Sequence, residues 1–174
     1  MFLQIIFIIK IIDNSQDYSY YLVIEEKSMR NLYNAVHLTT EQKVAYIRVL
    51  TYLAKSDRNP DYIERGFIKK LILRMNLTDD ILKSIFVPRN QEELYRALMP
   101  ISTRTIAIDL IHCLWFAASV NSMITDEEIA IIRKVAMILR IDNDTLLNIH
   151  NFVTDEIMFL QQARDVLEAD DIRC

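Results

Sequence analysis

The chain has 174 residues, of which 52% are hydrophobic and 25% charged, and this size and balance predict one domain with a developed core. It contains one glycine and three prolines, which disfavours an all-β sandwich or a doubly wound sheet and favours helices. The formal charge of −4 disfavours a nucleic-acid-binding surface, because neutralising phosphates needs a clustered basic face.

The N-terminal stretch is apolar and unlike the rest of the chain. Residues 2–12 are almost all apolar, and residues 18–24 are rich in branched and aromatic side chains. These segments predict a short N-terminal β-hairpin over residues 1–26. A two-stranded ribbon is marginal alone, so we expect it to pack on the bundle, pair with another subunit to form an oligomer or dock a partner through its edge. Lys10 and Asp13 cut the apolar run short of a membrane-spanning length, so we expect no transmembrane segment. A helix stays open as the alternative, because one helical face would hold Ile5, Ile8, Ile9 and Ile12.

A first helical hairpin is predicted over residues 39–86. Thr39 with Gln42 three residues on forms a capping box, and the apolar residues that follow recur at helical spacing. The polar stretch before Pro60 ends this helix. Asp61 with Glu64 forms another capping box, so a second helix is expected to begin there.

Residues 102–174 are predicted to hold a second copy of this hairpin and a closing helix. The stretch 105–118 is apolar nearly all round, which is typical of the central helix of a bundle. Thr125 with Glu128 forms the capping box of the next helix. A short helix over residues 92–98 is expected in the connection between the two copies.

The two hairpins are related by a constant offset in the numbering, which pairs Asp57 with Asn121 and Glu64 with Glu128. The closing helix carries one apolar stripe, and Glu156 is expected to face solvent beside it. The whole chain, residues 1–174, is therefore predicted to be mainly α: a single helical bundle made of two repeated helical hairpins, with the N-terminal β-hairpin as an extension.

The chain carries no recognisable catalytic motif. It has no HExxH, CxxC, P-loop or Gly-x-Ser-x-Gly sequence, so we predict that it is not an enzyme and takes no cofactor. Asp109 and His112 stand three residues apart in the predicted core helix, and we interpret them as a hydrogen-bonded buried pair or a groove-facing pair rather than an acid–base pair. Cys113 lies in an apolar stretch and Cys174 is the last residue, which indicates a reducing, cytoplasmic environment.

Residues 52–64 and 116–128 resemble the paired signature of TerB-like proteins of the tellurite-resistance group. In that family each copy reads as a small apolar helix end, Asp-Gly, a short gap and a Glu that opens the next helix. The resemblance implies an all-helical bundle in a bacterial, cytosolic protein, whose acidic motif residues bind a divalent metal. The motif Asp matches Asp57, and the motif Glu matches Glu64 and Glu128.

The sequence departs from this pattern at Asn121, which replaces the second motif Asp, and at Arg58 and Ser122, which replace both glycines. Loss of a carboxylate removes a hard oxygen ligand, and loss of glycine restricts a turn that needs positive φ. Hard cations take several oxygen ligands, but Glu64 and Glu128 are already explained as capping-box residues, so we favour capping and keep metal binding as the alternative. The candidate metal ligands are Asp57, Asp61, Glu64 and Glu128.

Acidic groups late in the chain are candidates for contact with a basic partner, because opposite charges steer association, although such charges are also common on solvated faces. We predict a non-catalytic protein-binding module with no nucleic-acid partner, in its most specific form a bacterial immunity-type protein that neutralises a basic toxin by binding it. The alternative is a divalent-metal-binding stress protein, as the resemblance implies. The candidate partner-binding residues are Asp126, Glu127, Asp142, Asp144, Glu168, Asp170 and Asp171.

Overall fold

The computed structural model describes residues 37–56, 62–119 and 124–171, without the side chains of 62–65, 163–164 and 166–171. All regular secondary structure in this part is helical, which confirms the predicted mainly α fold. The predicted N-terminal hairpin, with the contacts expected of its edge, lies outside the described residues. The helices in chain order are α3 (Thr40–Ala54), α4 (Tyr62–Met75), α5 (Asp79–Ser84), α6 (Gln91–Leu98), α7 (Arg104–Ser119), α8 (Asp126–Ile138) and α9 (Asn143–Asp171).

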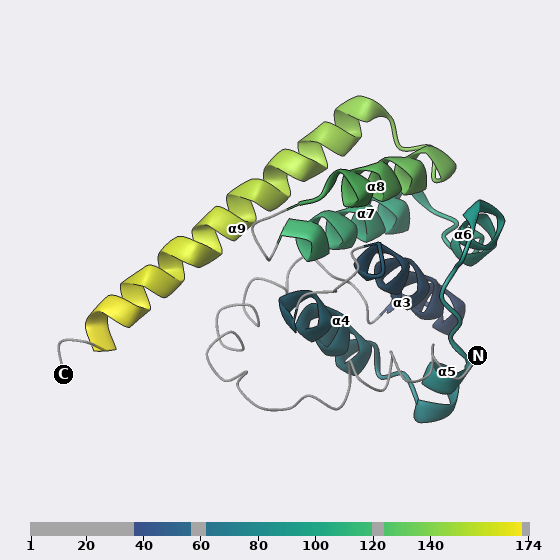
Figure 1. The fold of residues 1–174 in the computed structure, drawn as a ribbon, viewed down its shortest axis with the longest axis horizontal. Helices are drawn as coiled ribbons and strands as arrows, with labels where there is room; N and C mark the ends of the chain where they lie inside the picture. Colours follow the sequence, from purple (N-terminus) through teal and green to yellow (C-terminus); the bar gives the residue numbers. More distant parts are fainter. Residues whose placement is uncertain (1–36, 57–61, 120–123, 172–174) are drawn as a thin grey trace.

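Helix α7 lies at the centre of the fold (Figure 1). It packs against α3, α4, α8 and α9, and every residue from 110 to 118 is buried. The Phe67 and Phe116 rings meet with their centroids 5.2 Å apart. One hydrophobic cluster takes side chains from all the described helices, and each large member, such as Leu114, contributes about 1.5–3 kcal/mol by leaving water. The predicted core helix over residues 105–118 is confirmed.

Two of the predicted capping boxes are present, and the third, at the start of α4, lies outside the described residues. The Thr39 hydroxyl accepts from the Gln42 N–H at 3.3 Å, and Gln42 Oε1 accepts from the Thr39 N–H at 2.9 Å. The same reciprocal contacts join Thr125 and Glu128, at 3.2 Å and 2.8 Å. These bonds satisfy backbone donors that have no partner within the helix, so they fix where α3 and α8 begin.

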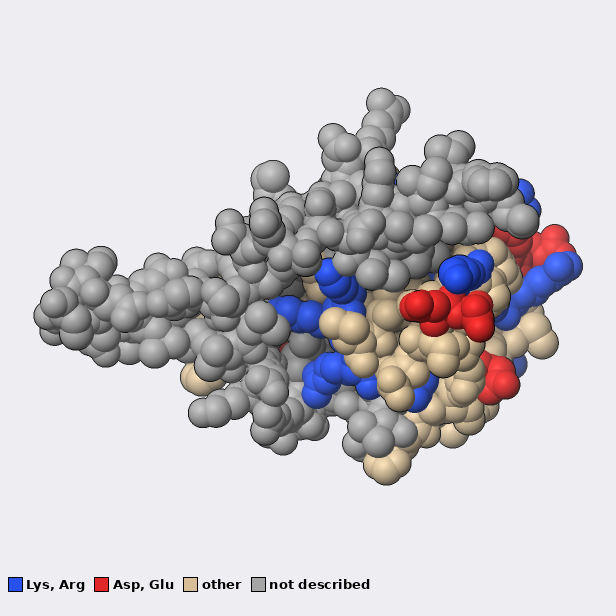
Figure 2. Space-filling model, turned by 90° about the horizontal axis from the view of Figure 1, so that it is seen from below, with Lys and Arg blue, Asp and Glu red and all other residues tan. Residues whose placement is uncertain are grey.

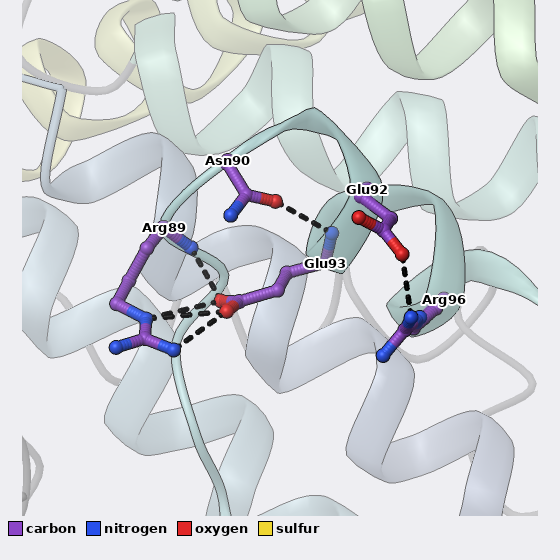
Figure 3. Close-up of polar contacts among 5 residues, drawn as sticks. All are labelled: Arg89, Asn90, Glu92, Glu93 and Arg96. Carbon is purple, nitrogen blue, oxygen red and sulfur yellow. Dashed lines mark hydrogen bonds and ion pairs between the residues drawn. The ribbon is translucent and has the colours of Figure 1, made fainter.

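Two short helices, α5 and α6, connect α4 to α7. The predicted helix over residues 92–98 corresponds to α6, whereas α5 was not predicted. The Asn90 side chain accepts from the Glu93 N–H at 2.9 Å and caps α6, and Arg89 pairs with Glu93 at 2.7 Å (Figure 3). Arg96 also pairs with Glu92 on this helix. Because these ion pairs are exposed and screened by solvent, the cap is what defines the start of α6.

The helix boundaries follow the same constant offset as the sequence. Helices α7, α8 and α9 begin at this offset from the starts of α3, α4 and α5 respectively. Asn76 after α4 and Arg140 after α8 are related by it too, and both have left-handed backbone, with φ of 50° and 58°. Residues other than glycine rarely adopt this backbone conformation. Finding it at both of these related positions is therefore unusual.

Helix α9 is much longer than the helix it packs against. It has 29 residues, which extend about 43 Å, whereas the 16 residues of α7 extend about 24 Å. Among its described side chains the last fully buried one is Val153, and Figure 1 shows its C-terminal part projecting beyond the other helices. None of the helices in the described part of the chain combines the length and apolarity needed to cross a membrane.

Candidate functional site

The candidate metal ligands are only partly placed by the structure. Asp57 and Asp61 lie outside the described residues, and Glu64 lies in α4 with its side chain not described. Glu128 is 1% exposed, and its carboxylate accepts from both the N–H and the hydroxyl of Thr125. Within the described residues no group of three or more His, Cys, Asp or Glu side chains is positioned to hold a metal ion. Metal binding therefore stays a prediction, and it rests mainly on Asp57 and Asp61, which precede α4, and on Glu64 in the first turn of that helix.

The candidate partner-binding carboxylates lie at three separate places. Asp126 and Glu127 are exposed in the first turn of α8, and Asp144 is exposed in the first turn of α9. The 13 residues of α8 separate these two places by about 20 Å. The third place is the last turn of α9, about 40 Å along that helix. It contains Glu168, Asp170 and Asp171, whose side chains are not described.

Asp142 differs from the other candidates because its contacts within the chain occupy it. Its carboxylate accepts from the Thr145 N–H at 2.8 Å and pairs with Arg104 at 2.9 Å. The backbone hydrogen bond from Thr145, followed by the contact with Arg104, holds the pKa of Asp142 far below its usual range. Asp142 is therefore a charged cap for α9 that also ties it to the start of α7.

Apolar side chains on α9 add a feature that the sequence analysis did not identify. Leu147, Phe152, Met158 and Phe159 are between 48% and 65% exposed. They lie outside the buried stripe of the same helix, which includes Val153. A helix whose buried stripe is already complete needs no further large apolar residues for folding, so their presence marks a candidate contact surface. Counting apolar residues outside the stripe is the sequence signal that would have found them.

Charge is unevenly divided along the chain from residue 37 onward. Residues 90–174 contain fourteen Asp and Glu against seven Lys and Arg, whereas residues 37–89 contain six against ten. Figure 2 views the molecule from below Figure 1, where α4 and α5 lie. Lys and Arg side chains gather in the middle of this described face, and acidic side chains lie toward its right-hand side. By these residue counts, the acidic character predicted for the partner surface belongs to residues 90–174, which include α8 and α9.

Buried polar contacts tie α7 to its neighbours on both sides. The Tyr46 hydroxyl on α3 lies 2.8 Å from Asp109 Oδ2 and 2.9 Å from the Ile106 carbonyl oxygen, so its proton is shared between two acceptors on α7. On the α9 side, His112 Nε2 lies 3.1 Å from Glu156 Oε2, and the two side chains are 8% and 7% exposed. Asp109 and His112 are each hydrogen-bonded to a different helix rather than to one another.

Burial sets the protonation of this network. Desolvation raises the pKa of Asp109 to about 6, although the hydrogen bond from Tyr46 and the attraction of His112 act in the opposite direction. Burial, with the nearby Cys113 and Asp109, raises the pKa of the Tyr46 phenol well above its usual range, so it remains a donor. Asp109 therefore changes charge at about pH 6, within the packing between α3 and α7.

The prediction that Glu156 faces solvent is wrong. Glu156 follows Val153 by three residues, so it continues the buried face of α9, and His112 supplies a polar partner there. Sequence reasoning also missed Tyr46 as the partner of Asp109. Both pairs join residues that are far apart in the chain, and helical periodicity alone carries no signal for such contacts.

Comparisons with known proteins give no match: no family model, curated protein or solved structure is similar to this chain. Its function is accordingly inferred from its own residues and their arrangement.

Proposed function

We propose that this chain is a non-catalytic protein-binding module, in which α9 and the acidic residues near it hold a basic partner protein. The observation that carries the proposal is the composition of the projecting helix. Exposed Phe152, Met158 and Phe159 share it with seven Asp and Glu residues, and its single basic residue is Arg164.

Each part of this surface has a separate role in binding. Exposed aromatic side chains and methionine supply most of the binding energy when a partner covers them: the aromatic rings are large and rigid, and methionine adapts its shape to the partner surface. Carboxylates around them speed association with a basic surface and disfavour an acidic one. The excess of negative charge on α9 also opposes pairing of this helix with a second copy of itself, so a basic partner fits better than self-association.

We further propose that the fold is TerB-like, built from two repeated helical hairpins, α3–α4 and α7–α8. Three observations support this architecture: the common offset of the helix starts, the packing of α3 on α4 and of α7 on α8, and the left-handed residues Asn76 and Arg140 at equivalent positions. In this arrangement α5 and the first turns of α9 are equivalent, and α9 is the element in which the second copy exceeds the first.

The most specific form of the proposal is an immunity-type protein that acts in the bacterial cytoplasm and neutralises a basic toxin by binding it. Fast association protects a cell against a toxin, and an acidic surface with apolar anchors provides it. This form predicts that the partner is toxic when expressed alone and harmless when co-expressed with this chain.

The test is affinity capture with the purified chain as bait, followed by identification of the retained protein. The bait variant carries Phe152→Ser and Phe159→Ser, and the control is Leu73→Ser, an apolar residue on α4 that is more exposed than either phenylalanine. We expect a basic protein to be retained by the wild type and by the control, and retained at least tenfold less by the double variant, since two apolar anchors are lost. Raising the salt concentration should slow its association.

Two results would contradict the proposal. If the wild-type bait retains no protein from its host at low salt, the chain does not act by stable protein binding. If a partner is retained equally by the double variant and the control, binding occurs but α9 is not the contact surface.

A further inference from the structure

A cavity of about 570 Å³ lies between α8 and α9, over the Trp115 side chain of α7. Helices α8 and α9 both pack against α7 but have little contact with each other, so a groove remains between them. Its walls are largely apolar and include Ile129 of α8 and Leu146 of α9. The volume lies within the range of about 300–1,000 Å³ that is usual for small-molecule sites.

Among the described residues that line this cavity no side chain is a carboxylate, although residues 90–174, to which they belong, are acidic. The polar side chains there are Arg133 of α8 and Asn143 and His150 of α9. Arg133 is exposed and makes no ion pair with any residue that the structure describes. The guanidinium group is therefore available to an anion from outside the chain.

Trp115 gives a second, independent indication of a ligand with a hydrogen-bond acceptor. Its indole is 6% exposed, and its Nε1 donor is buried with no hydrogen-bond partner in the described part of the chain. Its ring lies 4.4 Å from that of His150, centroid to centroid, at an angle of 50°. A buried N–H without an acceptor is costly. Because Nε1 is closed to solvent in this arrangement, the indole has to reorient toward the cavity before a ligand oxygen removes that cost.

We propose that this cavity binds a small carboxylic acid with an apolar body, of the medium-chain fatty-acid class. The apolar chain lies between Ile129 and Leu146, and the carboxylate contacts Arg133 at the rim. Reorientation of the Trp115 indole brings its N–H to the same carboxylate. Of the exposed apolar side chains on α9, Leu147 lines this cavity, whereas Phe152, Met158 and Phe159, which carry the proposed protein-binding surface, do not. The two proposals therefore rest on different residues and are tested separately.

The experiment is a titration of the full chain with decanoate, in parallel with decanol as the uncharged analogue, both kept below the concentration at which they aggregate. Trp115 is the only tryptophan, so its fluorescence and its single indole N–H resonance report on the cavity alone. We expect a saturable change with decanoate, a downfield shift of the indole proton, and at least tenfold weaker binding of decanol.

Two variants identify the carboxylate contact. Arg133→Gln removes the cation, and Asn143→Asp places a negative charge in the wall without changing its shape; both residues are exposed, so both variants should fold. Each should weaken decanoate binding about tenfold and leave decanol binding unchanged. The matched control is Lys134→Gln, a neighbouring cation on α8 that does not line the cavity, and it should bind decanoate as the wild type does.

Three outcomes would overturn the proposal. One is the absence of any decanoate-dependent change in both the fluorescence and the indole resonance. Another is equal binding of decanoate and decanol that ignores both variants, which would be non-specific partition into an apolar groove. The third is a change at Trp115 that occurs only with a captured partner protein, because the cavity would then receive a protein side chain.

Discussion

Asp109 offers the sharpest test of how burial controls this fold. The substitution Asp109→Asn keeps the size of the side chain and an oxygen that accepts from the Tyr46 hydroxyl, but it removes the carboxylate that desolvation disfavours. In the wild type the folded-state pKa is about 6 against 3.8 for the ordinary value. The folded protein thus binds this proton more tightly than the unfolded chain does.

The sign of the pH dependence follows directly. The stability gained from protonated Asp109 is complete below 3.8 and is lost as the pH rises through about 6. The gap between the two pKa values corresponds to about 3 kcal/mol, and partial exposure of the carboxylate reduces this to about 1–3 kcal/mol. Asparagine does not titrate, so the variant should gain stability relative to the wild type by this amount as the pH increases.

The assay is urea unfolding of both proteins, followed by circular dichroism from about pH 4.5 to about pH 7.5. In the difference between the unfolding free energies of variant and wild type, the contributions of the carboxylates that both proteins contain cancel. Asp155→Asn, an exposed substitution on α9, shows how much that difference changes with pH when a solvent-exposed carboxylate is removed. Tyr46→Phe removes the hydrogen bond that lowers the Asp109 pKa, so it should move the transition to higher pH. A difference that is constant across this range would refute the reasoning.

Three further outcomes test other parts of the structure by chemical denaturation. Glu156→Ala should destabilise the fold by about 1–3 kcal/mol because it leaves a buried partner without its acceptor, whereas Asp155→Ala should change stability by less than about 0.5 kcal/mol. Arg140→Gly and Asn76→Gly should each stabilise by up to about 1 kcal/mol, because glycine adopts positive φ without strain; a loss of stability would contradict this. Thr125→Ala should cost about 1 kcal/mol through loss of the α8 cap, and an unchanged unfolding midpoint would show that the cap contributes nothing.

Local signals in the sequence predicted the helices well because their causes are local. The capping boxes at Thr39 and Thr125 each depend on two residues three apart, and both appear as expected. The central helix was predictable because apolar residues cover nearly its whole circumference. By contrast, α5 has six residues and one buried side chain, Leu82, so it leaves little periodicity to detect.

The candidate site was less predictable because its features arise from packing between helices. Whether Glu156 is buried depends on where His112 lies after α9 has packed on α7, and periodicity alone placed Glu156 on the wrong side. The acidic residues were recognised from the sequence. The exposure of Phe159 was not, because it depends on α9 being longer than α7, the helix it packs against, and neither helix alone shows that difference.

The contact between His112 and Glu156 also fixes the direction in which α9 projects from the other helices. Apolar side chains let one helix slide or roll on another at small cost, whereas a polar pair inside the interface permits a single setting. The helix extends about 22 Å from Glu156 to its last residue. A rotation of the helix axis by roughly 10° about Glu156 would therefore displace the C-terminal end of α9 by about 4 Å. One polar contact in the interior therefore governs the position of the last turns of α9.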